Sequence, residues 1–118
     1  MSESSVAPPP QAIAHAAALL GVMSHPARLQ VLHALHTEGP MTAGALQSRV
    51  GLEASALSHQ LRILREARLV RVVPDGRHRI YALDDPHVAR LVDDALAHTA
   101  ERAVSPRAPV ATRGSRTE

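Results

Sequence analysis

The chain has 118 residues, and thirteen basic side chains, all arginine, face eleven acidic ones, so the formal net charge is only +2. This length supports one small domain. Because the chain has no cysteine, disulfides, thiolate metal sites and thiol catalysis are excluded, and nitrogen and oxygen must hold any bound metal. No segment approaches the roughly 20 apolar residues of a membrane span, and no signal peptide is recognisable at the N-terminus. We therefore expect a cytoplasmic protein that does not contact membranes.

The two ends differ in composition from the middle of the chain. Residues 1–10 are small and polar and end in three prolines, and residues 105–118 show no apolar periodicity. Both ends are therefore expected to be disordered. The folded domain is predicted to span residues 11–104, which is short enough that dimerisation would add needed stability.

Apolar residues at helical spacing, with capping and breaking residues between them, predict five helices. The first is rich in alanine and apolar around much of its circumference, so it needs packing partners on more than one side. Pro26 and Pro86 suit first helical turns, Thr42 and Asp85 are good N-caps, and Gly51 is a helix breaker. The predicted helices span residues 11–23, 26–37, 43–50, 54–68 and 86–102.

Residues 69–83 change to strand-like patterning around an Asp-Gly pair at positions 75 and 76, which predicts a β-hairpin. Only residues 51–53 separate the third and fourth helices, which is the length of the turn in a helix-turn-helix unit. The predicted fold is thus mainly helical, with a helix-turn-helix unit followed by a hairpin.

The helix predicted for residues 54–68 has an apolar face, with Leu57, Leu61 and Leu64, and a polar face. Short hydroxyl, imidazole and guanidinium groups on the polar face can bond base edges and phosphates in a major groove. On this helix alone, an ordinary solvated face explains the pattern equally well. The DNA-binding candidates here are Ser55, Ser58, His59 and Arg62.

The charges are separated along the chain. Residues 62–79 contain six arginines and two acids, whereas residues 84–101 contain five acids and one arginine. A basic helix and hairpin tip form the footprint expected for phosphate contacts, although solubilising surface is the alternative for the hairpin arginines. This region adds Arg65, Arg77, His78 and Arg79 to the DNA-binding candidates.

Several motifs together resemble a known family. HPARLQVLHAL at residues 25–35, SALSHQLRILREARLVR at 55–71, DGRHRIYAL at 75–83 and the DDPHVARLV that follows are similar to the ArsR/SmtB family of metal-responsive bacterial regulators. The resemblance covers about residues 13–102. It implies a winged helix-turn-helix homodimer, built through the first and last helices, that binds a palindromic double-stranded operator with an affinity set by an inorganic ligand.

The last predicted helix carries histidines and carboxylates at regular spacing. His87 and His98 lie on one flank but roughly 16 Å apart along the axis, which is too far for one ion. An antiparallel copy across a twofold axis would bring Asp85 and His87 to His98 and Glu101 of the partner subunit, making two sites per dimer. This pattern is similar to the family's C-terminal-helix site, and the alternative is that Asp85 only caps a solvated helix.

Two imidazoles and two carboxylates suit Zn(II), or Ni(II) and Co(II) if a further ligand raises the coordination number. His15 is an optional extra ligand, because the first helix is expected to pack near the last, and Asp94 is a candidate to orient His98. The family's other common site uses cysteines before the recognition helix, which this chain lacks. The remaining helical histidines are expected to be surface or packing residues: His25, His33 and His36.

Three alternatives fit parts of the sequence. One is a winged-helix regulator that does not sense metal, and another is a protein that acts with a co-regulator through its apolar first helix. A small metallohydrolase is the third, although both carboxylates would already be ligands and so small a domain leaves little room for a substrate pocket.

Overall fold

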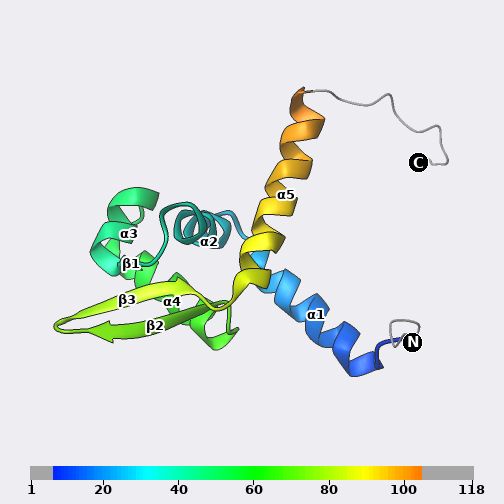
Figure 1. Ribbon diagram of the computed structural model, residues 1–118, viewed down its shortest axis with the longest axis horizontal. Helices are drawn as coiled ribbons and strands as arrows, with labels where there is room; N and C mark the ends of the chain where they lie inside the picture. The colour runs from blue at the N-terminus through cyan, green and yellow to red at the C-terminus, as the bar shows by residue number, and fades with distance from the viewer. Residues whose placement is uncertain (1–6, 105–118) are drawn as a thin grey trace.

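A computed structural model describes the backbone of residues 7–104 and the side chains of residues 7–100. The disorder expected for residues 1–6 and 105–118 lies outside this range. The described chain folds into five helices and a small sheet (Figure 1). In chain order the elements are α1 (Pro10–Met23), α2 (Pro26–Glu38), β1 (Met41–Thr42), α3 (Ala43–Val50), α4 (Ala54–Glu66), β2 (Val70–Asp75), β3 (His78–Leu83) and α5 (Pro86–Val104).

The hydrophobic core lies around α2, where Val31 and Leu32 are completely buried. The three leucines predicted to form the apolar face of α4 are all buried, which confirms the helical spacing read from the sequence. The hairpin and the first turns of α5 complete the core. Its members outside α2 are Met23, Leu46, Leu57, Leu61, Leu64, Leu69, Val70, Tyr81, Val88 and Val92.

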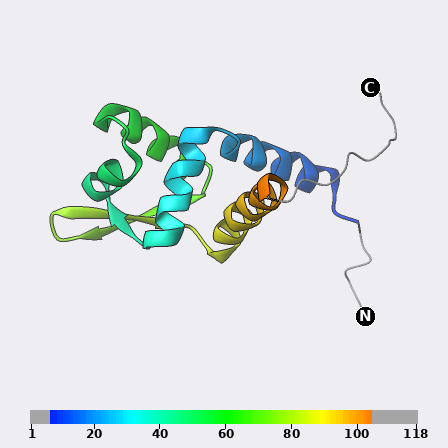
Figure 2. The same cartoon turned by 90° about the horizontal axis from the view of Figure 1, so that it is seen from above.

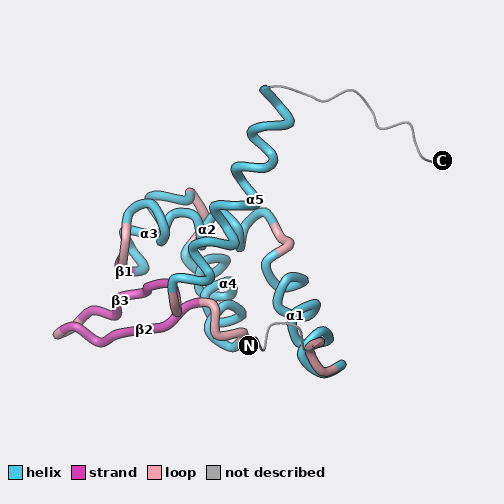
Figure 3. Tube along the Cα trace, turned by 45° about the vertical axis from the view of Figure 1, so that its right-hand side comes forward, coloured by secondary structure: helices cyan, strands magenta, loops and turns pink. Residues whose placement is uncertain are grey.

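The sheet has three antiparallel strands in the order β1-β3-β2. The hairpin is as predicted, and it extends away from the helices as a wing (Figure 3). Its tight turn is centred on Gly76 and Arg77, one residue later than the predicted Asp-Gly pair. Gly76 has a φ of 63° and Arg77 does not have a positive φ, which is the φ pattern of a type II′ hairpin turn.

The first strand, β1, was not predicted. Its two residues pair with Tyr81 and Ile80, and two residues are too few to show an alternating pattern. Thr42 also caps α3 as predicted, because its Oγ1 accepts a hydrogen bond of 3.1 Å from the Ala45 N–H. One residue thus ends the strand and starts the helix.

Helix α4 ends at Glu66, two residues before the predicted end. The Arg68 N–H donates to the Arg65 carbonyl at 3.0 Å, and the Leu69 N–H donates to the Leu64 carbonyl at 2.9 Å. With Arg68 at a φ of 61°, these bonds form a Schellman motif that turns the chain into β2.

Helices α1 and α5 extend away from the core (Figures 1 and 2). Only the first turns of α5 pack on α2, through the buried Val88 and Val92. Large apolar side chains on both helices stay exposed in this single protomer: Ile13 (60%), Leu20 (52%), Leu91 (38%) and Leu96 (39%). None of the helices in the described range is both long and apolar enough to cross a membrane.

Candidate functional site

Helix α4 presents the predicted DNA-binding side chains on one exposed face. Its packing leucines fix the rotation of the helix about its axis, so the opposite flank faces solvent. Arg62 Nη2 donates to His59 Nδ1 at 3.2 Å, which links two of these side chains across one helical turn. The exposed candidates on α4 are Ser55, Ser58, His59, Arg62 and Arg65.

A half-buried arginine that the sequence did not single out holds α4 in place. Arg28, on α2, donates from Nε to Gln60 Oε1 at 2.9 Å and from Nη1 to the Val22 carbonyl at 3.1 Å. These bonds connect the end of α1, the start of α2 and the inner side of α4. Arg28 and Gln60 are 32 residues apart, so no local pattern could have indicated this contact.

The tip of the wing carries the other predicted DNA-binding residues, Arg77, His78 and Arg79, all of which are exposed. Arg77 lies within the turn rather than after it. The Arg79 guanidinium lies 6.0 Å from the centre of the Tyr81 ring, which is a cation–π distance that restrains the side chain.

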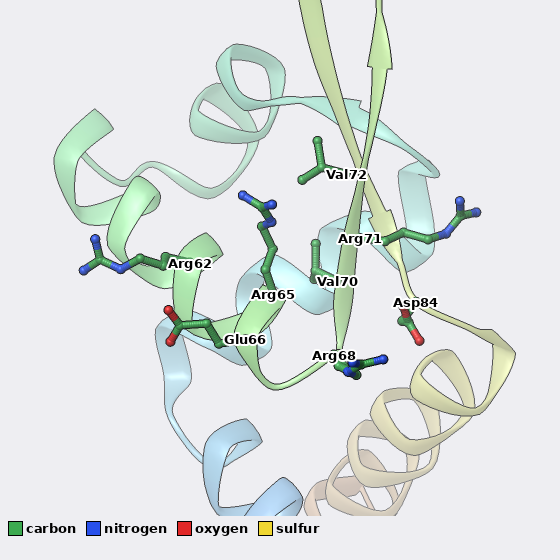
Figure 4. A pocket seen from close by; sticks show the side chains of 8 residues that line it. All are labelled: Arg62, Arg65, Glu66, Arg68, Val70, Arg71, Val72 and Asp84. Atoms are coloured by element: carbon green, nitrogen blue, oxygen red, sulfur yellow. The ribbon is translucent and has the colours of Figure 1, made fainter.

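An open groove of about 490 Å³ separates α4 from β2 (Figure 4). Its lining contains four arginines and two carboxylates, so the groove is electropositive. It joins the exposed face of α4 to the base of the wing. The lining residues are Arg62, Arg65, Glu66, Arg68, Val70, Arg71, Val72 and Asp84.

At the start of α5, Asp85 and His87 lie together as predicted. Asp85 Oδ1 accepts hydrogen bonds from the His87 N–H at 2.8 Å and the Val88 N–H at 3.3 Å, so Asp85 is the N-cap. The same oxygen lies 3.3 Å from His87 Nδ1, and the His87 side chain is 90% exposed. Asp85 Oδ2 takes part in none of these contacts. Because both side chains are exposed, a ligand outside the protomer can reach them.

The other predicted metal ligands do not join this pair within one protomer. His98 and Asp94 are exposed farther along α5, and the side chain of Glu101 lies outside the described residues. Among the described side chains, no three or more potential ligands gather within bonding range of one ion. The described side chains of one protomer therefore form no complete metal site.

His15, the optional extra ligand, lies on α1. It lines a small groove with Leu19, Val22 and Ala67, between α1 and the end of α4. Helices α1 and α5 leave the core in different directions (Figure 1).

A contact between α2 and α5 involves a histidine expected to be a surface or packing residue. His36 Nε2 lies 3.4 Å from Asp93 Oδ1, where the imidazole is 31% exposed and the carboxylate 66%. Both adjacent acids of α5 are exposed, and Asp93 faces His36 of α2.

Comparison with known proteins identifies the family. Residues 23–73 match the model of a helix-turn-helix domain. The HTH-type transcriptional regulator NmtR of Mycobacterium tuberculosis is 43% identical over 89 residues, which cover 75% of this chain and 73% of that relative. The HTH-type transcriptional repressor SmtB of the same organism is 34% identical over 99 residues, or 83% of this chain and 73% of the relative. The chain belongs to the ArsR/SmtB family.

Solved structures agree with this membership of the ArsR/SmtB family. The solution structure of apo-NmtR is 38% identical to this chain, with 95% of each chain covered and a TM-score of 0.69. The antimony-specific repressor AntR is 28% identical, with a TM-score of 0.74 over 82% of this chain and 87% of that one. As a member of the family, the chain is a DNA-binding transcriptional regulator with a winged helix-turn-helix fold and not an enzyme.

Proposed function

We propose that this regulator is a homodimer that binds a divalent transition metal ion, Zn(II), Ni(II) or Co(II), between its α5 helices. Each ion is held by Asp85 and His87 of one subunit and by His98 and Glu101 of the partner subunit. The observation that carries the proposal is the exposed Asp85–His87 pair at the start of a helix that leaves the core.

The donor set fits such an ion. Imidazole nitrogen and carboxylate oxygen are the ligand types that zinc accepts in a tetrahedron and that nickel and cobalt accept with more ligands. The pair occupies only one end of α5, and about 16 Å of helix separates His87 from His98. An antiparallel partner helix brings the two halves together, and the exposed Leu91 and Leu96 lie between them on the same helix.

Homodimerisation through α1 and α5 accounts for the apolar surface that one protomer leaves exposed. Four large apolar side chains on these two helices are between 38% and 60% exposed, and packing of the helices against a partner subunit would remove this apolar surface from water. A twofold dimer places two α4 helices on one side, where they are expected to contact two half-sites of a palindromic operator.

In the proposed dimer, metal binding and DNA binding are thermodynamically coupled. An ion that bridges two α5 helices holds the subunits in one relative orientation, and that orientation sets the spacing of the α4 helices. The coupling is reciprocal, so a tenfold effect of metal on operator affinity implies a tenfold effect of operator on metal affinity, or about 1.4 kcal/mol. Binding of DNA itself uses the exposed face of α4, with Ser55, Ser58, His59, Arg62 and Arg65, and the wing tip, with Arg77, His78 and Arg79.

One observation favours a second candidate, a winged-helix regulator that does not respond to metal. Asp85 already serves as the N-cap of α5, and this structural role alone is enough to explain an aspartate there. In that case operator affinity would be the same with added metal and with a chelator.

Titration of the purified apo-protein with zinc, nickel and cobalt, followed by calorimetry with and without operator DNA, separates the two candidates. The double variant His87→Ala/His98→Ala is expected to lose stoichiometric metal binding while the dimer stays folded, because both imidazoles are solvent-exposed. His25→Ala is the matched control, since His25 is an exposed histidine at the start of α2. Full metal affinity in the double variant would exclude the proposed site.

A further inference from the structure

Arg68 has a backbone conformation that an arginine rarely adopts. Its φ is 61°, and it is the one non-glycine residue with a positive φ in the described part of the chain. It occupies the left-handed position of the Schellman motif after α4, where glycine is the usual residue because a Cβ crowds the backbone there. A side chain kept at such a position despite the strain points to a role for that side chain.

The surroundings of Arg68 indicate what this role is. Arg68 lines the groove between α4 and β2 together with Arg62 and Arg65, and Figure 4 shows Arg65 extending above Val70 toward Val72 while Arg68 lies at the other end, near Asp84. Neither Arg65 nor Arg68 has a carboxylate oxygen within 4.0 Å among the described residues. None of the four arginines that line the groove forms an ion pair among the described residues, and Arg65 and Arg68 are two of them.

The side chain of the fourth arginine of the groove, Arg71, has a different orientation. Arg71 points away from Arg65, across β2 (Figure 4), and its Nε donates to the Leu83 carbonyl at 3.4 Å. The two carboxylates, Glu66 and Asp84, lie at the edges of the groove. An anion that enters between α4 and β2 would thus find Arg65 at one end of the groove and Arg68 at the other.

The sugar-phosphate backbone of bound DNA supplies such an anion. If α4 lies in the major groove and the wing reaches the neighbouring groove, one sugar-phosphate strand must pass between these two elements, since that strand separates the grooves. The arginine-lined groove is the part of the gap between these elements that lies at the base of the wing, beside the C-terminal half of α4. We propose that Arg68 binds a phosphate of this strand at its end of the groove, while Arg65 contacts the strand at the other end. The inference rests on the proposed use of α4 and the wing in DNA binding.

A purely structural explanation makes a different prediction. Arg65 and Arg68 are near the C-terminal end of α4, where positive charge favours the helix dipole. If that were their whole role, removal of Arg68 would lower the thermal stability and leave DNA affinity unchanged.

The test is the salt dependence of operator binding, measured by fluorescence anisotropy on a duplex that the wild-type protein has selected from a random-sequence library. Arg68→Gly and Arg68→Gln are each expected to weaken binding and to reduce the slope of log K against log salt by about 0.9 for each subunit bound. The melting temperature of Arg68→Gly should equal or exceed that of the wild type, because glycine relieves the strained backbone. Arg68→Lys keeps the charge and should keep the slope.

Two further variants distinguish a failure of the Arg68 phosphate contact from a failure of the proposed DNA-binding face. Arg90→Gln removes one exposed arginine from α5, a helix that is not part of the proposed DNA-binding face, and should leave the slope unchanged. Arg62→Ala tests the proposed DNA-binding face itself. If Arg62→Ala weakens binding while Arg68→Gly and Arg68→Gln retain the wild-type slope, the phosphate contact is refuted and the proposed face stands. If Arg62→Ala also binds like the wild type, the proposed face fails as well.

Discussion

Asparagine in place of Asp85 separates the two roles that this residue has in the proposal. The structure shows the carboxylate as an N-cap that accepts two backbone hydrogen bonds through Oδ1, at 2.8 and 3.3 Å. Asparagine offers an oxygen in the same position and caps helices about as well as aspartate, whereas alanine offers none. The two substitutions therefore have different effects on stability and a shared effect on metal binding.

The expected loss of stability follows from the geometry of the cap. The side chain of Asp85 is 46% exposed, so in Asp85→Ala water can bond to the backbone N–H groups that the carboxylate leaves free. The substitution should therefore lower the free energy of unfolding by about 1 kcal/mol. With an m value of about 2 kcal/mol per molar urea, this moves the unfolding midpoint by about 0.5 M. Asp85→Asn should unfold close to the wild-type midpoint when both are compared at the same protein concentration, which a dimer requires.

Metal affinity provides the second measurement. Both variants remove the anionic oxygen of Asp85, so calorimetry should show weaker binding of Zn(II) by at least about tenfold, the lower end of what even an outer-shell partner contributes. Wild-type metal affinity in Asp85→Asn would refute Asp85 as a ligand. An unchanged urea midpoint in Asp85→Ala would refute the energetic importance of the cap.

Three other substitutions test the fold and the placement of α4. Thr42→Val removes the hydroxyl that caps α3 at nearly constant volume and should cost about 1 kcal/mol in urea unfolding, with Thr42→Ser as the control that keeps the cap. Leu32→Ala removes a completely buried side chain and should cost about 2–5 kcal/mol, which circular dichroism during thermal unfolding would detect. Arg28→Met removes the bonds to Gln60 and the Val22 carbonyl and should cost about 1.5–3 kcal/mol. It should also weaken operator binding in a gel shift, and unchanged affinity would show that these bonds do not position α4.

Features that depend on a few consecutive residues could be read from the sequence by itself. The caps at Thr42 and Asp85, the helix breaker Gly51 and the hairpin were all predicted, because each is determined by the side chains of a short segment. Leucines at helical spacing likewise identified the buried face of α4, and the exposure of its predicted DNA-binding residues follows from that periodicity.

Features that join distant segments were decided only by the tertiary structure. The pairing of β1 with β3 and the contacts of Arg28 with Gln60 and of His36 with Asp93 depend on how α2 packs, and no short segment encodes that packing. The left-handed Arg68 has a related cause: Leu69 is buried and β2 must pair with β3, so the chain has to turn immediately after α4, whatever residue stands at the turn.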